Sequence, residues 1–446
     1  MHCLSLESLS QSFSKNMECL ERAHTLIPAG AHTYSKGDDC FPRMGPHYVV
    51  RGSGCRITDV DGHEYIDMGM ALTSGVLGFA FGPVLAKIRE ALELGAGFSL
   101  PHVIEMELAE KLISLIPSAE MVKLGKHGSD ATTGAVKLAR AFTGRDKIAV
   151  CADQPFFSTN DWFIGTTPCD TGIPKAVKSL TVKFRYNDLA SVERMFAENP
   201  GEIACVMLQP MEFDEPAPGY LEGVQTLCRK NGALLIFDEV ISGFRWHLRG
   251  AQHVFGVTPD LSCFGKSIAN GYSVSALVGR RDIMELGGTR KKGPKVFLLS
   301  TTHGGEVHEI AAALATIEFM EKNPVQDHLY RIGNLFRSRM NELANAKGIA
   351  DCFFVTGRGC RPLFVTRNRS GENDAALRTL FMQEMSFRGV LIPQVAPSWS
   401  MSEDDMNLVF KAAGEALDIY AKALDEGTGN YLVGNPMKPV FRPRND

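Results

Sequence analysis

Short apolar segments alternate with amphipathic ones through the middle of this 446-residue chain, and this alternation limits the folds open to it. Runs of four to six residues rich in Val, Ile, Leu, Phe and Ala have the composition of buried strands. The strands are expected at 147–151, 180–184, 203–208, 233–237, 261–264 and 274–278, and the clearest helices at 105–115, 131–142 and 221–230. The pattern predicts an α/β fold, in which helices flank a mainly parallel sheet.

The sequence changes in character on both sides of this region, which predicts a smaller α+β lobe built from both ends of the chain. A helix is expected at 11–27 and a hairpin with an Asp61-Gly62 turn at 55–67. Longer helices are expected at 325–346, 374–388 and 403–426. Because one hydrophobic core rarely organises so long a chain, we expect several parts. These are an N-terminal segment of the small lobe at 1–70, a large domain at 71–323 and a C-terminal small domain at 324–446.

Composition narrows the classes of partner. The net charge is −4, and no long run of one sign suggests nucleic-acid binding. The eleven cysteines form no C-x-x-C pair, so we expect reduced thiols and no metal site. Residues 1–15 lack the apolar core of a secretory signal, and the most apolar stretch, 74–86, is too short and too glycine-rich to span a membrane. These features favour a cytoplasmic protein.

Asp238 and Lys266 carry the clearest chemical signal. Asp238 ends the apolar run 233–237, and Lys266 follows the run 261–264 within Gly265-Lys266-Ser267. Parallel sheets bind ligands at the carboxyl ends of their strands. A lysine amine and a carboxylate placed there suit pyridoxal phosphate, because the amine forms a Schiff base and the carboxylate keeps the pyridinium nitrogen protonated. The alternative, a surface lysine and a helix-capping acid, fits the whole combination of segments less well.

A second signal is the turn Gly128-Ser129, which opens the predicted helix 131–142. Backbone N–H groups and the positive end of the helix dipole make such a turn a natural phosphate site. The alternative is ordinary capping of the helix by Ser129 or Asp130.

Three segments, 59–67, 137–148 and 259–271, resemble the class III aminotransferases, which are pyridoxal-phosphate enzymes of fold type I. The similarity is greater to their glutamate-1-semialdehyde 2,1-aminomutase branch, and it extends from about residue 21 to 314, more loosely to about 418. The resemblance implies a homodimer whose active sites lie at the subunit interface. It also implies the roles of the residues that bind the cofactor.

By this resemblance, His127, Gly128 and Ser129 hold the cofactor phosphate. Phe156 stacks on the pyridine ring, although Phe156 and Phe157 could instead be core residues. The remaining implied contacts are Val240 on the other ring face, Asp238 at the ring nitrogen, Lys266 at the aldehyde, and Thr302 reaching the phosphate of the neighbouring subunit. Four positions depart from the family pattern, where a small polar residue, histidine, glutamate and asparagine are usual. They are His127, Phe157, Gln209 and Glu306.

The substrate side departs further from the aminomutase pattern. Lys36 aligns with the arginine that grips the substrate carboxylate, and Leu72 aligns with a tryptophan of the pocket wall. Lysine cannot form the bidentate fork of arginine. We therefore expect an aminotransferase that moves an amino group from an amino-acid donor to a keto or aldehyde acceptor. Relatives that share the segment 33–37 resemble aminotransferases for sugars or sugar acids, and this resemblance implies an acceptor of that kind. The alternatives are the aminomutase of tetrapyrrole synthesis and an inactive scaffold subunit.

Overall fold

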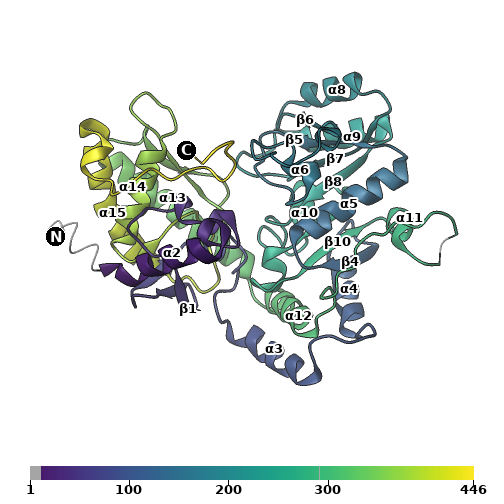
Figure 1. Ribbon diagram of the computed structural model, residues 1–446, viewed down its shortest axis with the longest axis horizontal. Coiled ribbons are helices and arrows are strands. Elements are labelled where there is room, and N and C mark those ends of the chain that lie inside the picture. The colour runs from purple at the N-terminus through teal and green to yellow at the C-terminus, as the bar shows by residue number, and fades with distance from the viewer. Residues whose placement is uncertain (1–11, 291, 446) are drawn as a thin grey trace. The chain divides into compact units, whose positions relative to one another are not determined.

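The computed structural model describes residues 12–290 and 292–445, which form two compact units (Figure 1). Unit 1 contains the chain up to Phe81 and the segment Asp327–Val440. Unit 2 contains Gly82–Gln326 and the C-terminal segment Phe441–Asp446. The units therefore divide at residues 81 and 326, where the sequence suggested 70 and 323. Most of the segment 1–15 and Cys3 lie outside the described residues.

Unit 2 is built on a seven-stranded sheet with the strand order β4-β10-β9-β8-β7-β5-β6. The strands are β4 (Met121–Gly125), β5 (Lys147–Cys151), β6 (Thr181–Phe184), β7 (Ile203–Leu208), β8 (Leu234–Asp238), β9 (Leu261–Phe264) and β10 (Ser275–Gly279). The neighbours from β9 to β6 are parallel, whereas β10 is antiparallel to both β9 and β4. The expected mainly parallel sheet is confirmed, and the strand that the sequence did not predict is β4.

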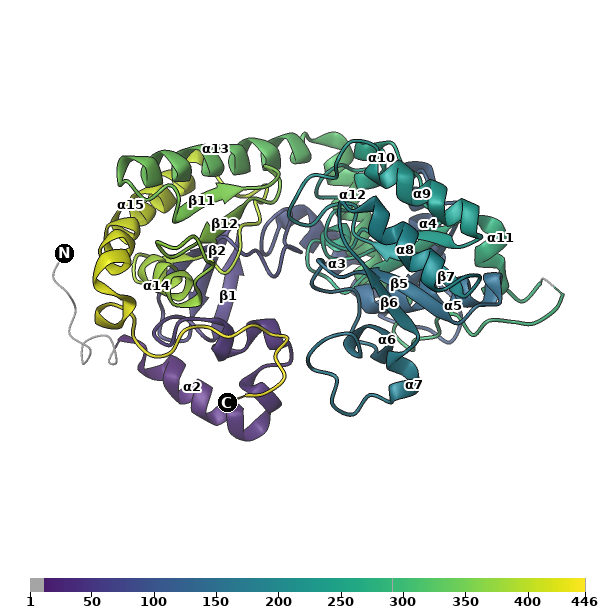
Figure 2. The same cartoon turned by 90° about the horizontal axis from the view of Figure 1, so that it is seen from above.

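Helices cover the sheet of unit 2 (Figures 1 and 2). Every residue of β7, β8, β9 and β10 is buried, as expected for strands covered on both faces. The longer helices are α3 (Gly82–Leu94), α4 (Ile104–Leu115), α5 (Gly128–Thr143), α8 (Leu189–Glu198), α9 (Tyr220–Asn231) and α12 (Val307–Lys322). The shorter ones are α6 (Asp161–Ile164), α7 (Lys175–Lys178), α10 (Ala251–Phe255), α11 (Arg281–Met284) and the 3₁₀ turn η4 (Lys266–Ala269).

Unit 1 joins an N-terminal and a C-terminal part of the chain through its own sheet, whose order is β1-β2-β3-β13. Its strands are β1 (Val49–Ser53), β2 (Arg56–Asp59), β3 (Glu64–Asp67) and β13 (Val390–Leu391), beside a hairpin of β11 (Phe353–Thr356) and β12 (Leu363–Thr366). Its helices are α2 (Ser14–Leu26), α13 (Val325–Ala346), α14 (Ala375–Ser386) and α15 (Glu403–Glu426). Because β13 pairs with β3, residues more than 300 positions apart share one core.

A left-handed turn follows β3 in unit 1. Four consecutive residues that are not glycine, Met70, Ala71, Leu72 and Thr73, have φ values of 43°, 51°, 56° and 74°. The Thr73 N–H donates to the Gly69 carbonyl at 3.0 Å, so the segment forms one turn of left-handed helix. The carboxylate of Asp67 accepts from the N–H groups of Gly69 and Met70 at 2.7 and 3.2 Å. Each such residue costs about 1–2 kcal/mol, so surrounding contacts must hold the turn in place.

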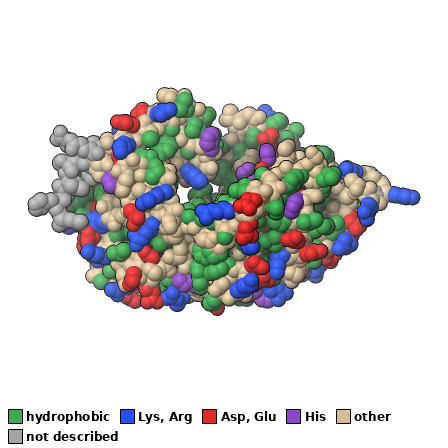
Figure 3. Space-filling view, turned by 90° about the horizontal axis from the view of Figure 1, so that it is seen from below, with side chains coloured by type: hydrophobic (Ala, Val, Ile, Leu, Met, Phe, Trp, Pro, Cys, Tyr) green, Lys and Arg blue, Asp and Glu red, His purple; other side chains and the backbone are tan. Residues whose placement is uncertain are grey.

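On the face drawn in Figure 3, basic and acidic side chains are interspersed rather than gathered by sign. In the described parts of the chain, residues 12–290 and 292–445, no helix combines the length and the apolar character that crossing a membrane requires.

Candidate active site

The structure brings Asp238 and Lys266 to one edge of the sheet in unit 2. Asp238 is the last residue of β8 and lies opposite Cys263 of β9, and Lys266 opens η4 just after β9. Both residues therefore stand at the carboxyl ends of neighbouring parallel strands, as predicted. Lys266 has a φ of 47°, a left-handed conformation that a residue with a long side chain adopts only under constraint.

Asp238 is 5% exposed, and this burial raises the pKa of its carboxylate to about 7. The Val240 N–H, which donates to Asp238 Oδ1 at 3.0 Å, and the positive charge of Lys266 both act to lower that pKa. The buried carboxylates of Glu212 and Glu239 act to raise it. A cation placed beside Asp238 would favour its charged form, because opposite charge stabilises a buried carboxylate.

The predicted phosphate turn contacts the same strand end. A Cβ atom added to Gly128 would lie 2.8 Å from both methyl groups of Val240, and one added to Gly265 would lie 3.3 Å from a Val240 methyl. Gly128 is therefore required by close packing, and this packing holds the first turn of α5 against the ends of β8 and β9. The N–H groups at a helix start have no carbonyl partner within the helix, which leaves them available to an anion.

Capping at this turn falls to Asp130 rather than to Ser129. The Asp130 carboxylate accepts from the N–H groups of Lys126 and His127, both at 2.9 Å. The Ser129 hydroxyl instead accepts from the Thr159 N–H at 3.0 Å, so it joins α5 to the loop after β5. The side chain of His127 is exposed.

The two phenylalanines after β5 have different environments. Phe157 is 1% exposed, packs edge-on against Phe163 and accepts from the Thr132 hydroxyl through its carbonyl at 2.9 Å, so it is a core residue. Phe156 is 40% exposed and has its ring edge against Phe163, with 5.7 Å between ring centroids. Phe156 therefore presents free aromatic surface, which a flat ligand could cover.

A pair of buried glutamines supports this loop. The Gln154 side chain donates to the Gln209 carbonyl at 2.7 Å and accepts from the Gln209 N–H at 2.8 Å, as a neighbouring strand would. The Gln209 side chain in turn donates to the Phe156 carbonyl at 3.3 Å. An amide can make this last bond whereas the glutamate usual at position 209 cannot donate a proton when ionised. Sequence reasoning did not single out Gln154, because its partner is 55 residues away.

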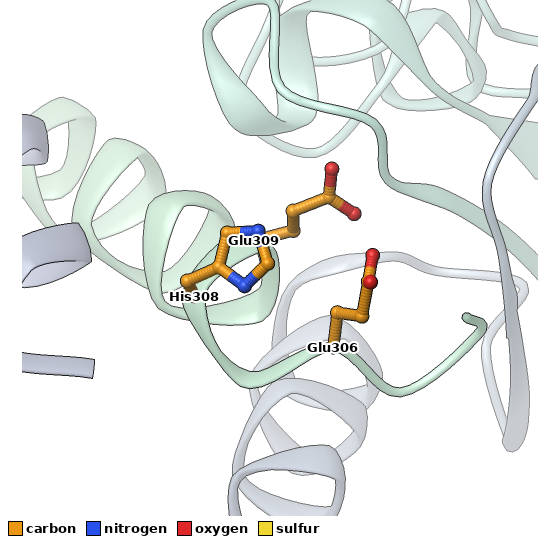
Figure 4. A group of neighbouring side chains, drawn as sticks. All are labelled: Glu306, His308 and Glu309. Atoms are coloured by element: carbon orange, nitrogen blue, oxygen red, sulfur yellow. The ribbon is translucent and has the colours of Figure 1, made fainter. Parts of the chain in front are cut away.

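Lys126, next to the phosphate turn, forms ion pairs with Glu306 and Glu309 at the start of α12. The distance to Glu306 is 2.6 Å, and the three side chains are 13%, 22% and 14% exposed. Figure 4 shows the two carboxylates pointing into a common space beside His308. Their geometry could suit a metal ion, since potential ligand atoms of Glu306, His308 and Glu309 lie within 4.8 Å of one another. The ammonium of Lys126 already supplies a cation there.

Three predicted residues remain, namely Thr302, Lys36 and Leu72. Thr302 is exposed, in the loop before α12. Lys36 and Leu72 belong to unit 1. Asp67 interacts with the charge of Lys36 and with the backbone of the turn that contains Leu72. Burial raises the pKa of Asp67 to about 6, and the charge of Lys36 acts to lower it. Leu72 lies in the left-handed turn whose N–H groups donate hydrogen bonds to the Asp67 carboxylate. Asp67 is therefore a candidate site residue that the sequence alone did not reveal.

The residues of unit 2 fit pyridoxal phosphate. A buried carboxylate is costly unless a positive charge compensates it, and a protonated ring nitrogen supplies that charge. Lys266 stands beside the carboxylate, a side-chain-free glycine lines the helix start, and an exposed aromatic ring is available for stacking. This combination is characteristic of fold type I enzymes that use the cofactor.

Comparison with known proteins agrees with a pyridoxal-phosphate enzyme. The family model "Aminotransferase class-III" matches residues 42–398. A glutamate-1-semialdehyde 2,1-aminomutase of Desulforamulus reducens is 32% identical, over 93% of this chain and 100% of that protein. A 3-aminobutyryl-CoA aminotransferase of Cloacimonas acidaminovorans is 35% identical, over 83% and 88%. Among solved structures, the PLP form of the FumI protein of Sphingopyxis sp. MTA144 has a TM-score of 0.85 and 25% identity, over 95% and 99%.

The chain belongs to the class III aminotransferase family, and its cofactor is pyridoxal 5′-phosphate.

Proposed function

We propose that this protein is an aminotransferase that moves an amino group from an amino-acid donor to a keto or aldehyde acceptor, with Lys266 and Asp238 as its catalytic residues. The observation that carries the proposal is the placement of these two side chains at neighbouring strand ends, with the carboxylate buried. The cofactor, when bound, supplies an aromatic ring that takes up the electron pair released at the substrate carbon. Lys266 Nζ anchors the cofactor and holds the proton that moves during the transfer.

The other predicted site residues of unit 2 bind and orient the cofactor. Asp238 holds the ring nitrogen in its protonated form. Val240 lines one ring face, and Phe156 stacks on the other. We assign the phosphate to the first turn of α5, from His127 to Ser129, where Gly128 leaves the backbone accessible.

We further propose a homodimer in which Thr302 reaches the phosphate of the neighbouring subunit. Large apolar side chains are exposed along one continuous part of unit 2, from the end of α3 to the start of α4. They are Leu92, Leu94, Phe98, Leu100, Val103 and Met106, which are 50–78% exposed. A hollow of about 450 Å³ adjoins this stretch and is lined partly by Thr301, Gly304 and Gly305, the neighbours of Thr302. Apolar surface of this extent is typical of a protein interface.

Glutamate-1-semialdehyde 2,1-aminomutase is a second candidate, because one such protein matches this chain over 93% of its length. Lys36 and Leu72 favour the aminotransferase, since they replace an arginine and a tryptophan of the aminomutase pocket. The two reactions differ in what they consume. A mutase converts one substrate alone, whereas an aminotransferase needs both an amino donor and a carbonyl acceptor.

Two experiments test the function. Borohydride reduction of the holoenzyme followed by peptide mapping should place the label on Lys266, and a label elsewhere would refute the assignment. Holoenzyme is then converted to its amino form with an amino donor, and oxo-acids, acyl thioesters and keto-sugars are screened for return of the aldehyde spectrum. Conversion of glutamate-1-semialdehyde without any donor would instead identify the mutase. A protein that stays colourless with the cofactor would indicate an inactive scaffold.

The role of Lys36 can be tested in the same screen. We expect Lys36→Ala to weaken the use of acidic acceptors while the cofactor spectrum stays unchanged. Arg51→Ala is the matched control, because Arg51 is also an exposed cation of unit 1. An acceptor profile identical to that of the native enzyme would exclude Lys36 from substrate recognition.

A further inference from the structure

The C-terminal segment returns to unit 2 after a long passage through unit 1. Residues 327–440 belong to unit 1, but Phe441–Asp446 cluster with unit 2. Pro436, Pro439 and Pro443 punctuate this tail, and proline reduces the conformational freedom that a segment loses on docking. The tail therefore has the composition of a segment that docks in an ordered way.

Phe441 docks on the loop that carries Phe156. Its ring lies nearly parallel to that of Phe156, with 6.4 Å between centroids and an interplanar angle of 18°. The same ring meets Phe163 edge-on, at 6.2 Å and 82°. One residue further, the Arg442 carbonyl accepts from the Cys169 thiol at 3.2 Å. Three contacts thus fix the tail against the segment between β5 and β6.

These contacts complete the support of Phe156. Its carbonyl is held by Gln209, and its ring has Phe163 at its edge. Phe441 adds a nearly parallel neighbour, and such pairs restrict the tilt of both rings. The centroid separation of 6.4 Å corresponds to an offset arrangement, and Phe156 keeps 40% of its surface exposed. The arrangement orients Phe156 and leaves it room to stack on a ligand.

We propose that Phe441 is a positioning residue of the cofactor site, which orients the ring of Phe156 so that the C-terminal tail is a working part of the active site. The inference rests on the proposed function, in which Phe156 stacks on the cofactor ring.

The main test measures cofactor binding to the full-length protein. Apo protein is titrated with pyridoxal phosphate, and the dissociation constant is read from the absorbance change. For Phe441→Ala we expect this constant to rise about 2- to 10-fold, the range that follows from the strength of aromatic pairs. A chain ending at Val440 should behave in the same way. Phe441→Tyr, which keeps the ring, should bind like the native protein.

Arg444→Ala is the matched control, since Arg444 is an exposed residue of the same tail. Its dissociation constant should not change. A native constant for both Phe441→Ala and the shortened chain would overturn the proposal, and so would tighter binding, which would mean that the tail obstructs the site.

A double-mutant cycle separates this inference from the function on which it rests. If Phe156→Ala leaves cofactor binding unchanged, the stacking role of Phe156 fails. If Phe156→Ala weakens binding and Phe441→Ala has no further effect in that background, Phe441 acts through Phe156. A full effect of Phe441→Ala in the Phe156→Ala background would mean that Phe441 acts elsewhere, which would overturn the positioning role.

Discussion

The two units place their predicted functional residues by different means. In unit 2, Asp238 and Lys266 follow neighbouring strands, and strand register brings them together. In unit 1, Leu72 lies in a left-handed turn of four residues that are not glycine, held by the carboxylate of Asp67. In unit 2 the ends of regular strands position Asp238 and Lys266, although Lys266 itself has a left-handed backbone. In unit 1 a run of four left-handed residues carries Leu72, which we assign to substrate choice. The difference suggests that substrate preference can change without disturbing the cofactor machinery.

The largest effect is expected from Lys266→Ala, which removes the amine at the predicted cofactor site of unit 2. The rate of the half-reaction with an amino donor should fall by at least about 10³-fold, because the proposed mechanism needs this amine both to anchor the cofactor and to hold the transferred proton. Stopped-flow absorbance measures this rate. Lys295→Ala, an exposed lysine of the same unit, should retain the native rate. Near-native turnover of the Lys266→Ala protein would refute the assignment of Lys266 as the residue that anchors the cofactor.

Asp238→Asn should lower kcat/KM by about 10²-fold, because a neutral amide does not stabilise the ring cation.

The same change should alter how the stability of the apo protein depends on pH. Burial raises the Asp238 pKa from 3.8 to about 7, so the folded state holds this proton more tightly than the unfolded state. The unfolding free energy of the native apo protein should therefore fall as the pH rises from about 4 to about 7, by an amount on the order of 4 kcal/mol.

Asp238→Asn should abolish that part of the fall. Denaturant unfolding of both apo proteins at pH 4.5 and pH 8 measures the difference. The added cofactor should also remove it in the native protein, since the ring cation stabilises the carboxylate. Equal pH dependence in the two apo proteins would show that Asp238 does not carry the buried charge.

Lys126→Met tests the ion pairs beside the phosphate turn. It leaves Glu306 and Glu309 without their cation, which should lower the unfolding free energy by about 2 kcal/mol because all three groups are partly buried. Lys111→Met is the control, because Lys111 pairs with Glu321, which lies on α12 as Glu309 does. This pair is more exposed, so its loss should lower the unfolding free energy by less than about 1 kcal/mol. Similar costs for the two variants would remove any special role for Lys126.

The smallest effect concerns the left-handed turn. Ala71→Gly should be neutral or stabilising by about 0.5 kcal/mol, because relief of backbone strain offsets the greater freedom of the unfolded chain. Ala421→Gly is the matched change inside the right-handed helix α15, and it should destabilise by about 1 kcal/mol. Thermal unfolding of the two variants compares them directly. Equal losses would mean that the turn at residues 70–73 stores no strain.

Much of unit 2 was predictable because its signals are local. Strand positions such as 147–151 and 203–208 agree with the structure, since buried parallel strands are almost continuously apolar. The strand β4 was missed because it is an edge strand that carries Lys123 and is only partly buried. In unit 1, the long helix 403–426 was predicted, whereas nothing local signals the left-handed turn at 70–73.

The sequence by itself determined the fold class and the chemical identity of the site, because hydrophobic periodicity and the segments around Asp238 and Lys266 are properties of neighbouring residues. Only the tertiary structure decided which distant groups support that site. Gln154 bonds to Gln209, Lys126 pairs with Glu306 and Glu309, and Phe441 reaches Phe156. Such partnerships depend on where the folded chain brings remote segments together, and side-chain hydrogen bonds, ion pairs and ring contacts leave no periodic trace in the sequence.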